Sequence, residues 1–515
     1  MKAFTEPLLS LAGFEEMTKT AEKSSGLISV TGCIDAQKSQ MIYAFGGHRK
    51  NKLIVTFGEQ KAKELYDEYS FFDKEVVYYP SKDVLFYQSD IRGNLLTAER
   101  IRALKAIREQ ERVTLVTTFD ALMNTMAPIE KMWENVLTLE QEQLLDLKEI
   151  QAALIRMGYE KEYQVQTMGQ FSVRGGILDV FPLTEENPIR IELWGDEIDT
   201  IRYFDCESQK SIENIDRVSI YPAAELVLSD EEKAGGIDKL KAEAKRVSDK
   251  LRKQMKTEEA HRVTVMADEL TEEWGELSMY AGMDAFLSYF FDERFGLLDY
   301  FNPSDSLIFF DELTRCVEQG KLTETEFSES MKQRLAMGYI LPGQMNGLFT
   351  EKEIVAKLGK YSCIALAALD NKANGLHQLG SYGIHCQSVS PYNNSFELLI
   401  KDLKRYKKNG YRVILLSGSR TRAKRLSEDI TDQGITCFYT ENYDHELFEG
   451  QIMVCYGKVR RGFEYPILKF AVITESDIFG AQQKKKKRHR TYEGEKIQSF
   501  TDLSVGDYVV HENHG

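Results

Sequence analysis

The chain has 515 residues, of which 42% are hydrophobic and 29% are charged, and its formal net charge is −15. This composition is typical of a folded protein of about three or four domains, and it excludes disordered, collagen-like and fibrous proteins. The acidic balance excludes a protein that coats nucleic acid over its whole surface, although a local basic patch could still bind DNA. Seven scattered cysteines without a Cys-x-x-Cys pair argue against a zinc ribbon and favour a reducing, cytoplasmic setting.

Short apolar runs alternate with helical patterns over the first 125 residues. We expect strands at Leu53–Phe57, Val76–Tyr79 and Val113–Thr117, separated by helices at Glu59–Tyr69 and Thr97–Gln110. Strands and helices that alternate at this spacing predict a parallel sheet covered by helices.

Closely spaced strands replace this pattern after about residue 137. Apolar runs joined by glycine or proline turns occur at Phe171–Val173, Ile177–Phe181, Pro188–Trp194 and Glu197–Phe204. The Gly-Asp pair between the last two runs is typical of a hairpin. These runs predict a small domain with an antiparallel sheet that ends near residues 221–222.

Helical patterning returns after residue 222. One long, Lys/Glu-rich helix is expected at Ile237–Glu258, and a short apolar strand at Leu307–Phe310. A third α/β block is expected from about residue 362 to residue 480. Its strands are expected at Cys363–Ala368, Val413–Leu416, Ile435–Phe438, Met453–Tyr456 and Ala471–Thr474, and its helices at Ser395–Lys407 and Arg420–Gln433.

A degenerate phosphate-binding loop is found at residues 32–39. The segment follows a short apolar run and matches the pattern G-x-x-x-x-G-K-[ST] at Gly32, Lys38 and Ser39. Gln37 stands where the pattern requires glycine, which lets backbone N–H groups surround a phosphate in conformations that a side chain disfavours. These residues are candidates for nucleotide binding, but a strand–loop–helix junction without a nucleotide is the preferred interpretation.

An acidic pair, Asp311 and Glu312, follows the apolar strand expected at 307–310. In nucleotide-hydrolysing proteins such a pair supplies a magnesium-binding Asp and a catalytic Glu. Together with the loop, the pair resembles a RecA-like nucleotide fold whose site is damaged.

The segment 171–182 is the most distinctive in the chain, because Arg174-Gly-Gly interrupts an apolar strand as a bulge or a tight bend would. In a later strand, apolar residues alternate with Arg190, Glu192 and Trp194, so these three are expected to share one face. If that face is exposed, the Arg–Trp pair is typical of an interface anchor. If both faces are covered, Trp194 lies in the core, and both interpretations stay open.

A basic run, Lys484–Arg490, lies in a polar stretch near the end of the sequence. It could contact phosphate groups or an acidic partner, but a solvated linker is the preferred interpretation. A strand-like segment at Asp507–His511 begins shortly before the last residue, Gly515, which suggests a sequence that stops inside a further domain.

Four segments in this order resemble the bacterial transcription-repair coupling factor (Mfd) family over nearly the whole chain. They are Phe171–Pro182, Pro188–Ser211, Arg461–Gly480 and Gly506–Gly515. The resemblance implies a multidomain α/β protein, in which a RecA-like parallel-sheet domain is split by a small α+β insertion and followed by a second α/β domain. The implied boundaries are 1–125 and 222–350 for the RecA-like domain, 126–221 for an inserted UvrA-binding domain, 355–480 for the α/β domain, 481–502 for a basic linker and 503–515 for the start of an RNA polymerase-interacting domain.

The resemblance also implies a function as an adaptor, which recruits UvrA of nucleotide excision repair to RNA polymerase stalled on damaged DNA. The positions that match the family's UvrA contact are Arg174, Arg190 and Trp194. No cofactor is expected in this fragment, because the family's nucleotide site in this module is degenerate. The motor domains that use ATP and magnesium to translocate on duplex DNA are expected beyond residue 515. Duplex DNA should bind this fragment only weakly, mainly through the run at 484–490, because the rest of the surface is acidic.

Two other hypotheses stay open. In the first, the chain is an active ATPase or helicase-like repair enzyme that acts through the loop at 32–39 with Asp311 and Glu312; Gln37 argues against it. In the second, the chain is a DNA-binding module that uses aromatic residues at 66–87 and the basic run at 484–490. The acidic balance of the chain argues against this second hypothesis.

Overall fold

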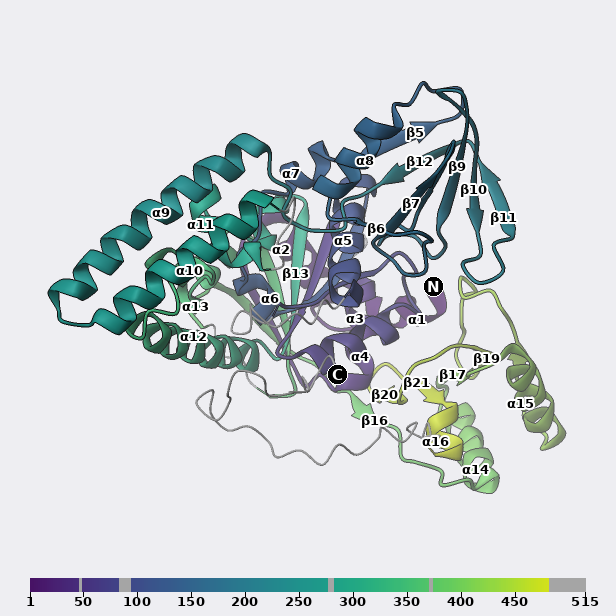
Figure 1. Cartoon of the computed structure of the whole chain (residues 1–515). Coiled ribbons are helices and arrows are strands. Elements are labelled where there is room, and N and C mark those ends of the chain that lie inside the picture. Colours follow the sequence, from purple (N-terminus) through teal and green to yellow (C-terminus); the bar gives the residue numbers. More distant parts are fainter. Residues whose placement is uncertain (46–48, 83–93, 277–281, 370–373, 481–515) are drawn as a thin grey trace, which may run out of the picture. The chain divides into compact units, whose positions relative to one another are not determined.

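A computed structural model describes residues 1–45, 49–82, 94–276, 282–369 and 374–480 (Figure 1). None of the helices in these ranges combines the length and apolar character needed to cross a membrane. The described residues separate into two compact units. The first unit holds residues 1–388, 442–447 and 463–470, and the second holds residues 389–441, 448–462 and those from 471 onward.

Seven parallel strands of the described chain form the central sheet of the first unit, in the order β15–β1–β14–β13–β2–β4–β3. The strands β4, β13 and β14 are buried along their whole length, as expected for parallel strands covered on both faces. The predicted parallel sheet is therefore confirmed. The bounds are β1 Gly26–Thr31, β2 Asn51–Thr56, β3 Val77–Tyr79, β4 Val113–Thr118, β13 Ser306–Asp311, β14 Ser362–Leu366 and β15 Gln378–Gly383.

Helices pack on both faces of this sheet. On one face, Val55 of β2 and Phe310 of β13 share a hydrophobic core with α5, α12 and α13. On the other face, Phe309 of β13 packs against Phe45 of α3, with ring centroids 6.4 Å apart. The helices of this part are α1 Lys2–Leu9, α2 Phe14–Lys23, α3 Asp35–Phe45, α4 Glu59–Tyr69, α5 Asn94–Glu109, α6 Phe119–Met123, α7 Ile129–Glu134, α11 Leu287–Phe290, α12 Leu313–Ala336 and α13 Glu351–Leu358.

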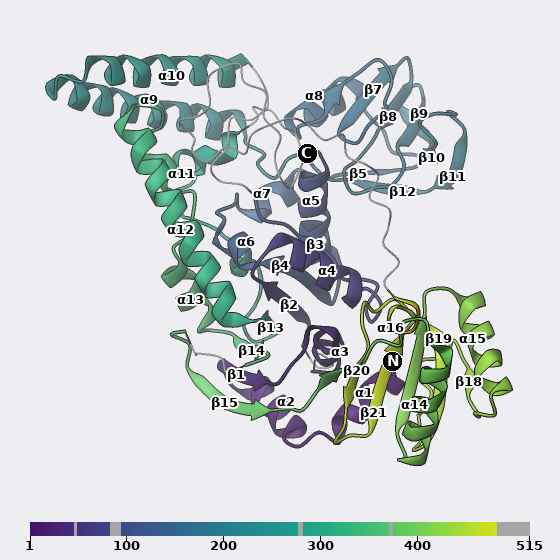
Figure 2. The same cartoon turned by 90° about the horizontal axis from the view of Figure 1, so that it is seen from below.

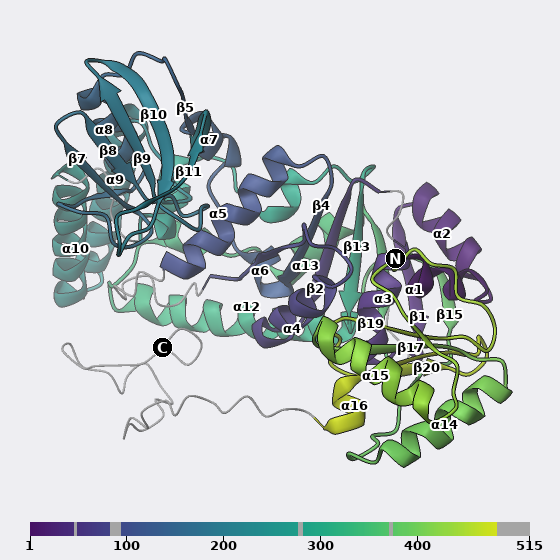
Figure 3. The same cartoon turned by 90° about the vertical axis from the view of Figure 1, so that its right-hand side faces the viewer.

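A second sheet interrupts the first unit between α7 and α9 (Figure 3). Its strand order is β11–β10–β9–β8–β7–β6, with antiparallel pairs throughout except for the short parallel pair β6–β7. The Arg-Gly-Gly segment forms the tight bend between β7 and β8, where Gly175 has a φ of +61°. The predicted hairpin at Gly195-Asp196 joins β9 and β10. The bounds are α8 Leu147–Arg156, β6 Glu160–Lys161, β7 Gln170–Arg174, β8 Ile177–Val180, β9 Ile189–Trp194, β10 Glu197–Phe204 and β11 Ser211–Ile215, with a separate antiparallel pair of β5 Leu137–Glu140 and β12 Arg217–Ile220.

Two long helices, α9 (Asp230–Lys253) and α10 (Thr257–Glu276), lie side by side as a hairpin (Figures 1 and 2). The helix predicted over Ile237–Glu258 is confirmed as far as Lys253, but its predicted end is wrong, because the chain reverses at Met255, which has a φ of 64°. The connection contains neither glycine nor proline, so the sequence pattern runs through it without an interruption.

The strand predicted at Cys363–Ala368 is β14, and it pairs with β1 and β13 in the first sheet. The prediction that this strand opens the third block is therefore wrong. A continuous apolar run looks the same in any buried parallel sheet, so it does not show which sheet the strand joins. The set of domain boundaries given above stays a prediction.

The second unit contains its own parallel strands. Strand β19 (Ile452–Tyr456) lies between β17 (Arg412–Ser417) and β18 (Phe438–Tyr439) and is parallel to both, and β21 (Phe470–Thr474) lies on the other side of β17. Its helices are α14 Phe396–Lys408, α15 Arg420–Asp432 and α16 Glu475–Phe479. Two short strands of the first unit, β16 Gln387–Ser388 and β20 Phe463–Tyr465, form an antiparallel pair.

Candidate partner-binding surface and nucleotide site

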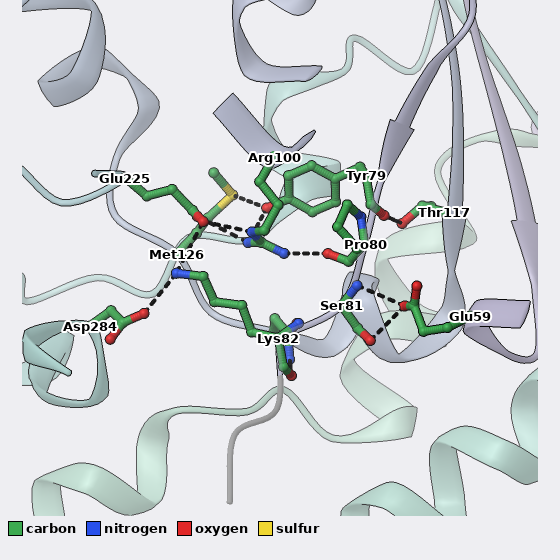
Figure 4. Close-up of polar contacts among 11 residues, drawn as sticks. Glu59, Tyr79, Pro80, Ser81, Lys82, Arg100, Thr117, Met126, Glu225 and Asp284 are labelled. Carbon is green, nitrogen blue, oxygen red and sulfur yellow. Dashed lines mark hydrogen bonds and ion pairs between the residues drawn. The ribbon is translucent and has the colours of Figure 1, made fainter. Parts of the chain in front are cut away.

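A buried ion cluster anchors the chain where it leaves the second sheet (Figure 4). Arg100 of α5 donates two hydrogen bonds to the carboxylate of Glu225, at 2.6 and 3.0 Å, and its guanidinium lies over the ring of Tyr79. Lys82 bonds to the same carboxylate at 3.1 Å and to Asp284 at 2.7 Å. Burial alone would raise the pKa of Glu225, but Arg100 and Lys82 outweigh burial and lower it to about 2. The cluster therefore fixes the return of the insertion onto the first sheet.

Two of the three predicted partner-binding residues converge on a buried carboxylate, that of Asp179 in β8. Arg190 of β9, directly opposite Asp179 in the sheet, donates to it at 2.7 and 2.9 Å. Arg174 donates to the same carboxylate at 2.8 Å. Arg190 also donates to Gln209 at 2.8 Å and lies over the ring of Phe204. The hydrogen bonds to Asp179 raise the pKa of Arg190. The same carboxylate holds the guanidinium groups of both arginines in place.

The third residue, Trp194, has no such support. It ends β9 at the hairpin turn and is 85% exposed, which decides between the two interpretations of this strand in favour of the outward one. Its neighbours Ile189 and Ile191 face the core, as the alternation predicts. The side chain of Arg174 is 36% exposed, whereas that of Arg190 is only 13% exposed. The surface therefore contains one exposed tryptophan at the hairpin end of β9 and two arginines of unequal accessibility, of which Arg190 lies four residues before Trp194 on the same strand.

The predicted phosphate loop has the expected position between β1 and α3, and the structure brings Lys38 together with Asp311 and Glu312. The ammonium group of Lys38 lies 2.5 Å from a carboxylate oxygen of Asp311 and 2.9 Å from one of Glu312. Burial alone would lower the pKa of Lys38, but the two carboxylates outweigh burial and raise it. Thr56 donates to the second oxygen of Asp311 at 2.9 Å. Lys38 is 1% exposed, so its ammonium group pairs with carboxylates inside the protein and does not face solvent.

The backbone of the loop is occupied as well. The N–H groups of Gly32 and Cys33, at the start of the loop, donate to the carbonyl oxygens of Ala368 and Ala367 at 3.3 and 2.9 Å. Gly32 has a φ of +78°, and its Cα packs so closely against the carbonyl group of Ile384 that a Cβ atom would collide with it. Ile384, directly after β15, therefore packs against the first residue of the loop.

Gln37, the departure from the phosphate-loop pattern, takes part in this closure. Its side chain is fully buried and its Oε1 accepts a hydrogen bond of 3.2 Å from the hydroxyl group of Tyr465 in β20. The Oγ of Ser39, at the pattern's magnesium-binding position, is buried and has no hydrogen-bond partner among the described residues. Because the N–H groups of Gly32 and Cys33 and the ammonium group of Lys38 are already paired, and the side chain of Gln37 is buried against Tyr465, this arrangement does not fit ATP with magnesium.

Comparison with known proteins shows which proteins this chain resembles. Residues 137–226 match the family model described as the UvrB interaction domain, and this range contains the whole second sheet and the Asp179 cluster. The chain is 29% identical to the transcription-repair-coupling factor of Bacillus subtilis (strain 168) over 465 residues, which cover 90% of this chain and 39% of that protein. It is 28% identical to that of Staphylococcus haemolyticus, covering 95% and 41%, and 27% identical to that of Staphylococcus aureus (strain MRSA252), covering 98% and 42%.

This chain is homologous to the N-terminal part of transcription-repair-coupling factors. It spans about two fifths of the length of the curated relatives that it matches. In this chain, the range that matches the UvrB interaction domain is inserted into an α/β unit with a parallel sheet.

Sequence reasoning missed the residues that support each site. Asp179 organises both arginines, and the signal for it was present, because an acidic residue inside an apolar strand requires a cationic partner when it is buried. Ile384 and Tyr465, which close the loop, lie hundreds of residues beyond it in the sequence. No local pattern indicates such contacts, so only the fold reveals them.

Proposed function

We propose that this chain is an adaptor that recruits UvrA of nucleotide excision repair through the insertion at 137–226. The observation that carries the proposal is the match of this range to the UvrB interaction domain, together with the exposed Trp194 inside it. Tryptophan and arginine are among the residue types enriched at the energetic centres of protein interfaces. The fold has no need of an exposed tryptophan at this position, since burial of its ring would be gained only on binding.

Two further partners belong to the same proposal. RNA polymerase would be bound through the domain whose start was predicted at 503–515, and duplex DNA would be contacted by the basic run 484–490. Both segments lie outside the described residues. The chain would act without a cofactor of its own. An ATPase acting through residues 32–39 finds no support in the geometry, because Lys38 is already paired with two carboxylates.

Titration of UvrA against the chain tests the adaptor function. Trp194→Ala should weaken binding roughly thirtyfold, which corresponds to about 2 kcal/mol for an interface anchor. Met255→Ala is the matched control, because Met255 is an equally exposed apolar residue, 86% exposed, on the connection between α9 and α10. It should leave the affinity unchanged.

The titration is repeated with and without ATP, and thermal melts of each variant are recorded alongside. Wild-type affinity in Trp194→Ala would remove this surface from the interface. Absence of any complex between UvrA and the wild-type chain would contradict the adaptor function itself.

A further inference from the structure

The second unit carries an exposed basic surface on α14 and α15. Between residues 401 and 425 the sequence has ten Lys or Arg residues and a single acidic residue, Asp402, in a chain whose formal net charge is −15. Nine of the ten basic residues are exposed, and we call them the α14–α15 surface. They are Lys401, Lys404, Arg405, Lys407, Lys408, Arg420, Arg422, Lys424 and Arg425.

Both helices cover the same face of the second unit's sheet. One hydrophobic core contains Leu403 of α14, Leu426 of α15 and alternate residues of β17. On α14, the exposed residues Lys401, Lys404 and Lys408 follow the three-to-four residue spacing of one helical stripe. The charges therefore point away from the core that the two helices share.

The placement of these charges does not serve the stability of the helices. Four of the first six residues of α15 are basic and its first turn contains no acidic residue, although the macrodipole disfavours cations at a helix N-terminus. On α14, lysines three and four residues apart repel one another. Arg420 and Arg422 are paired with Glu441 and Glu475. Arg405 is paired with Asp402. Six members of the surface have no ion-pair partner within the described part of the chain: Lys401, Lys404, Lys407, Lys408, Lys424 and Arg425.

We propose that the α14–α15 surface binds the phosphate backbone of duplex DNA without reading its sequence. Duplex DNA presents one negative charge per roughly 1.7 Å of its axis, and the members of the surface that lack an ion-pair partner are free to neutralise such phosphate charges. Protein partners are held mainly by buried aromatic anchors. Among the described residues of α14 and α15, one large apolar side chain is exposed, that of Leu398, and no aromatic side chain is fully exposed. A nucleic-acid backbone therefore fits this surface better than an acidic protein does.

The test removes four unpaired charges from the surface. The variant Lys401→Gln/Lys404→Gln/Lys408→Gln/Arg425→Gln is compared with wild type by titration of a fluorescein-labelled duplex of about 30 base pairs, between roughly 50 and 200 mM salt. The variant should lose roughly tenfold or more in affinity at the lower salt concentration. The slope of log K against log salt should flatten by about 0.9 for each phosphate group that the variant no longer neutralises.

A control variant with the same change in net charge separates a site from a general effect of charge. Lys250, Arg252, Lys253 and Lys256 are exposed at the connection between α9 and α10, and all four are changed to Gln. This control should keep wild-type affinity and slope. Both variants are also made in a chain whose basic residues at 484–490 are Gln, so that this run cannot hide the contribution of α14 and α15.

Three results would overturn the proposal. Equal losses in the two variants would show that only net charge matters, and no loss in the surface variant would show that DNA binds elsewhere. Polyglutamate is used as a second probe, because it carries negative charge without phosphate. If the wild-type chain binds polyglutamate as tightly as DNA and the surface variant loses both equally, the surface is one for an acidic protein. Selective loss of DNA in the surface variant supports the proposal.

Discussion

The phosphate loop and the insertion surface both contain a basic side chain paired with a buried carboxylate, but only the insertion surface keeps a large apolar side chain exposed. In each, a basic side chain is held by a buried carboxylate: Lys38 by Asp311, and Arg190 by Asp179. At the loop, the lysine and the backbone donors of Gly32 and Cys33 are paired, and the site is covered. At the insertion, the carboxylate holds the arginines in place, while Trp194, at the end of the same strand as Arg190, stays exposed.

The difference shows that residue type alone does not make a binding site. Lys38 and Arg190 are both motif residues with carboxylate partners, but only the second lies beside a surface that can still bury area on binding. What decides the outcome is whether the surrounding chain leaves unpaired groups at the surface. Mutations at the two regions can test this division between a closed and an open region.

The largest expected effect is at the closed region. Lys38→Met keeps most of the side-chain volume but leaves the carboxylate of Asp311, which is 1% exposed, without its cation. Loss of one partner of a buried ion pair costs about 3–5 kcal/mol. We therefore expect a large fall in the urea midpoint of unfolding, which circular dichroism measures.

Two comparisons complete this experiment. Adding Asp311→Asn to Lys38→Met should recover part of the loss, because the uncompensated charge is then removed. Trp194→Ala, at the open region, should change the free energy of unfolding by less than about 0.5 kcal/mol. Equal destabilisation by the changes at Lys38 and Trp194 would contradict the division.

The ion cluster at Glu225 belongs with the closed type, and its expected effect appears in acid. The pKa of Glu225 is about 2 in the folded chain, below its ordinary value of 4.5, so its stabilising contribution is complete above pH 4.5 and is lost as the pH falls toward 2. The contribution is on the order of 3 kcal/mol. Urea midpoints measured across this pH range should fall more steeply for wild type than for Glu225→Gln. Identical pH dependence in the two proteins would show that the cluster does not hold Glu225 ionised.

The next effect concerns the stability that Arg190 contributes in the open region. Arg190→Ala removes a doubly bonded partner from the buried carboxylate of Asp179, while Arg174 remains, so we expect a loss of about 2 kcal/mol. Arg190→Lys should recover only part of it, because an ammonium group lacks the planar fork that makes two parallel hydrogen bonds. Urea unfolding of both variants checks this, and an unchanged midpoint for Arg190→Ala would place Arg190 among free surface residues.

Much of this architecture can be predicted from the sequence, for identifiable reasons. The alternation of short apolar runs and helices predicted the parallel sheet, and alternation along β9 placed Trp194 and Arg190 on one face. These signals are local, since they depend on residues two to four positions apart. The membership of β14 in the first sheet, the reversal at Met255 and the closure of the phosphate loop depend on contacts between distant segments. No sequence period encodes those contacts.

The smallest expected effect concerns the cause of the closed state. From the sequence, Gln37 was the reason to doubt nucleotide binding, whereas the structure adds the pairing of Lys38 and the cover supplied by Ile384 and Tyr465. Restoring the glycine with Gln37→Gly removes only the first obstacle. It also removes the hydrogen bond from Tyr465 and places a glycine in α3, so a stability loss of about 1 kcal/mol is expected without any ligand.

The informative quantity is therefore the change in melting temperature when magnesium and ATP are added to each protein. A ligand present at about a hundred times its Kd stabilises the protein that binds it by about 2.7 kcal/mol, which a melt detects readily. We expect no shift for wild type and none for Gln37→Gly, because the N–H groups of Gly32 and Cys33 still donate to the chain. A clear rise in the variant alone would show that Gln37 by itself keeps the nucleotide out, and that the covering segments yield to a ligand once the loop can wrap a phosphate.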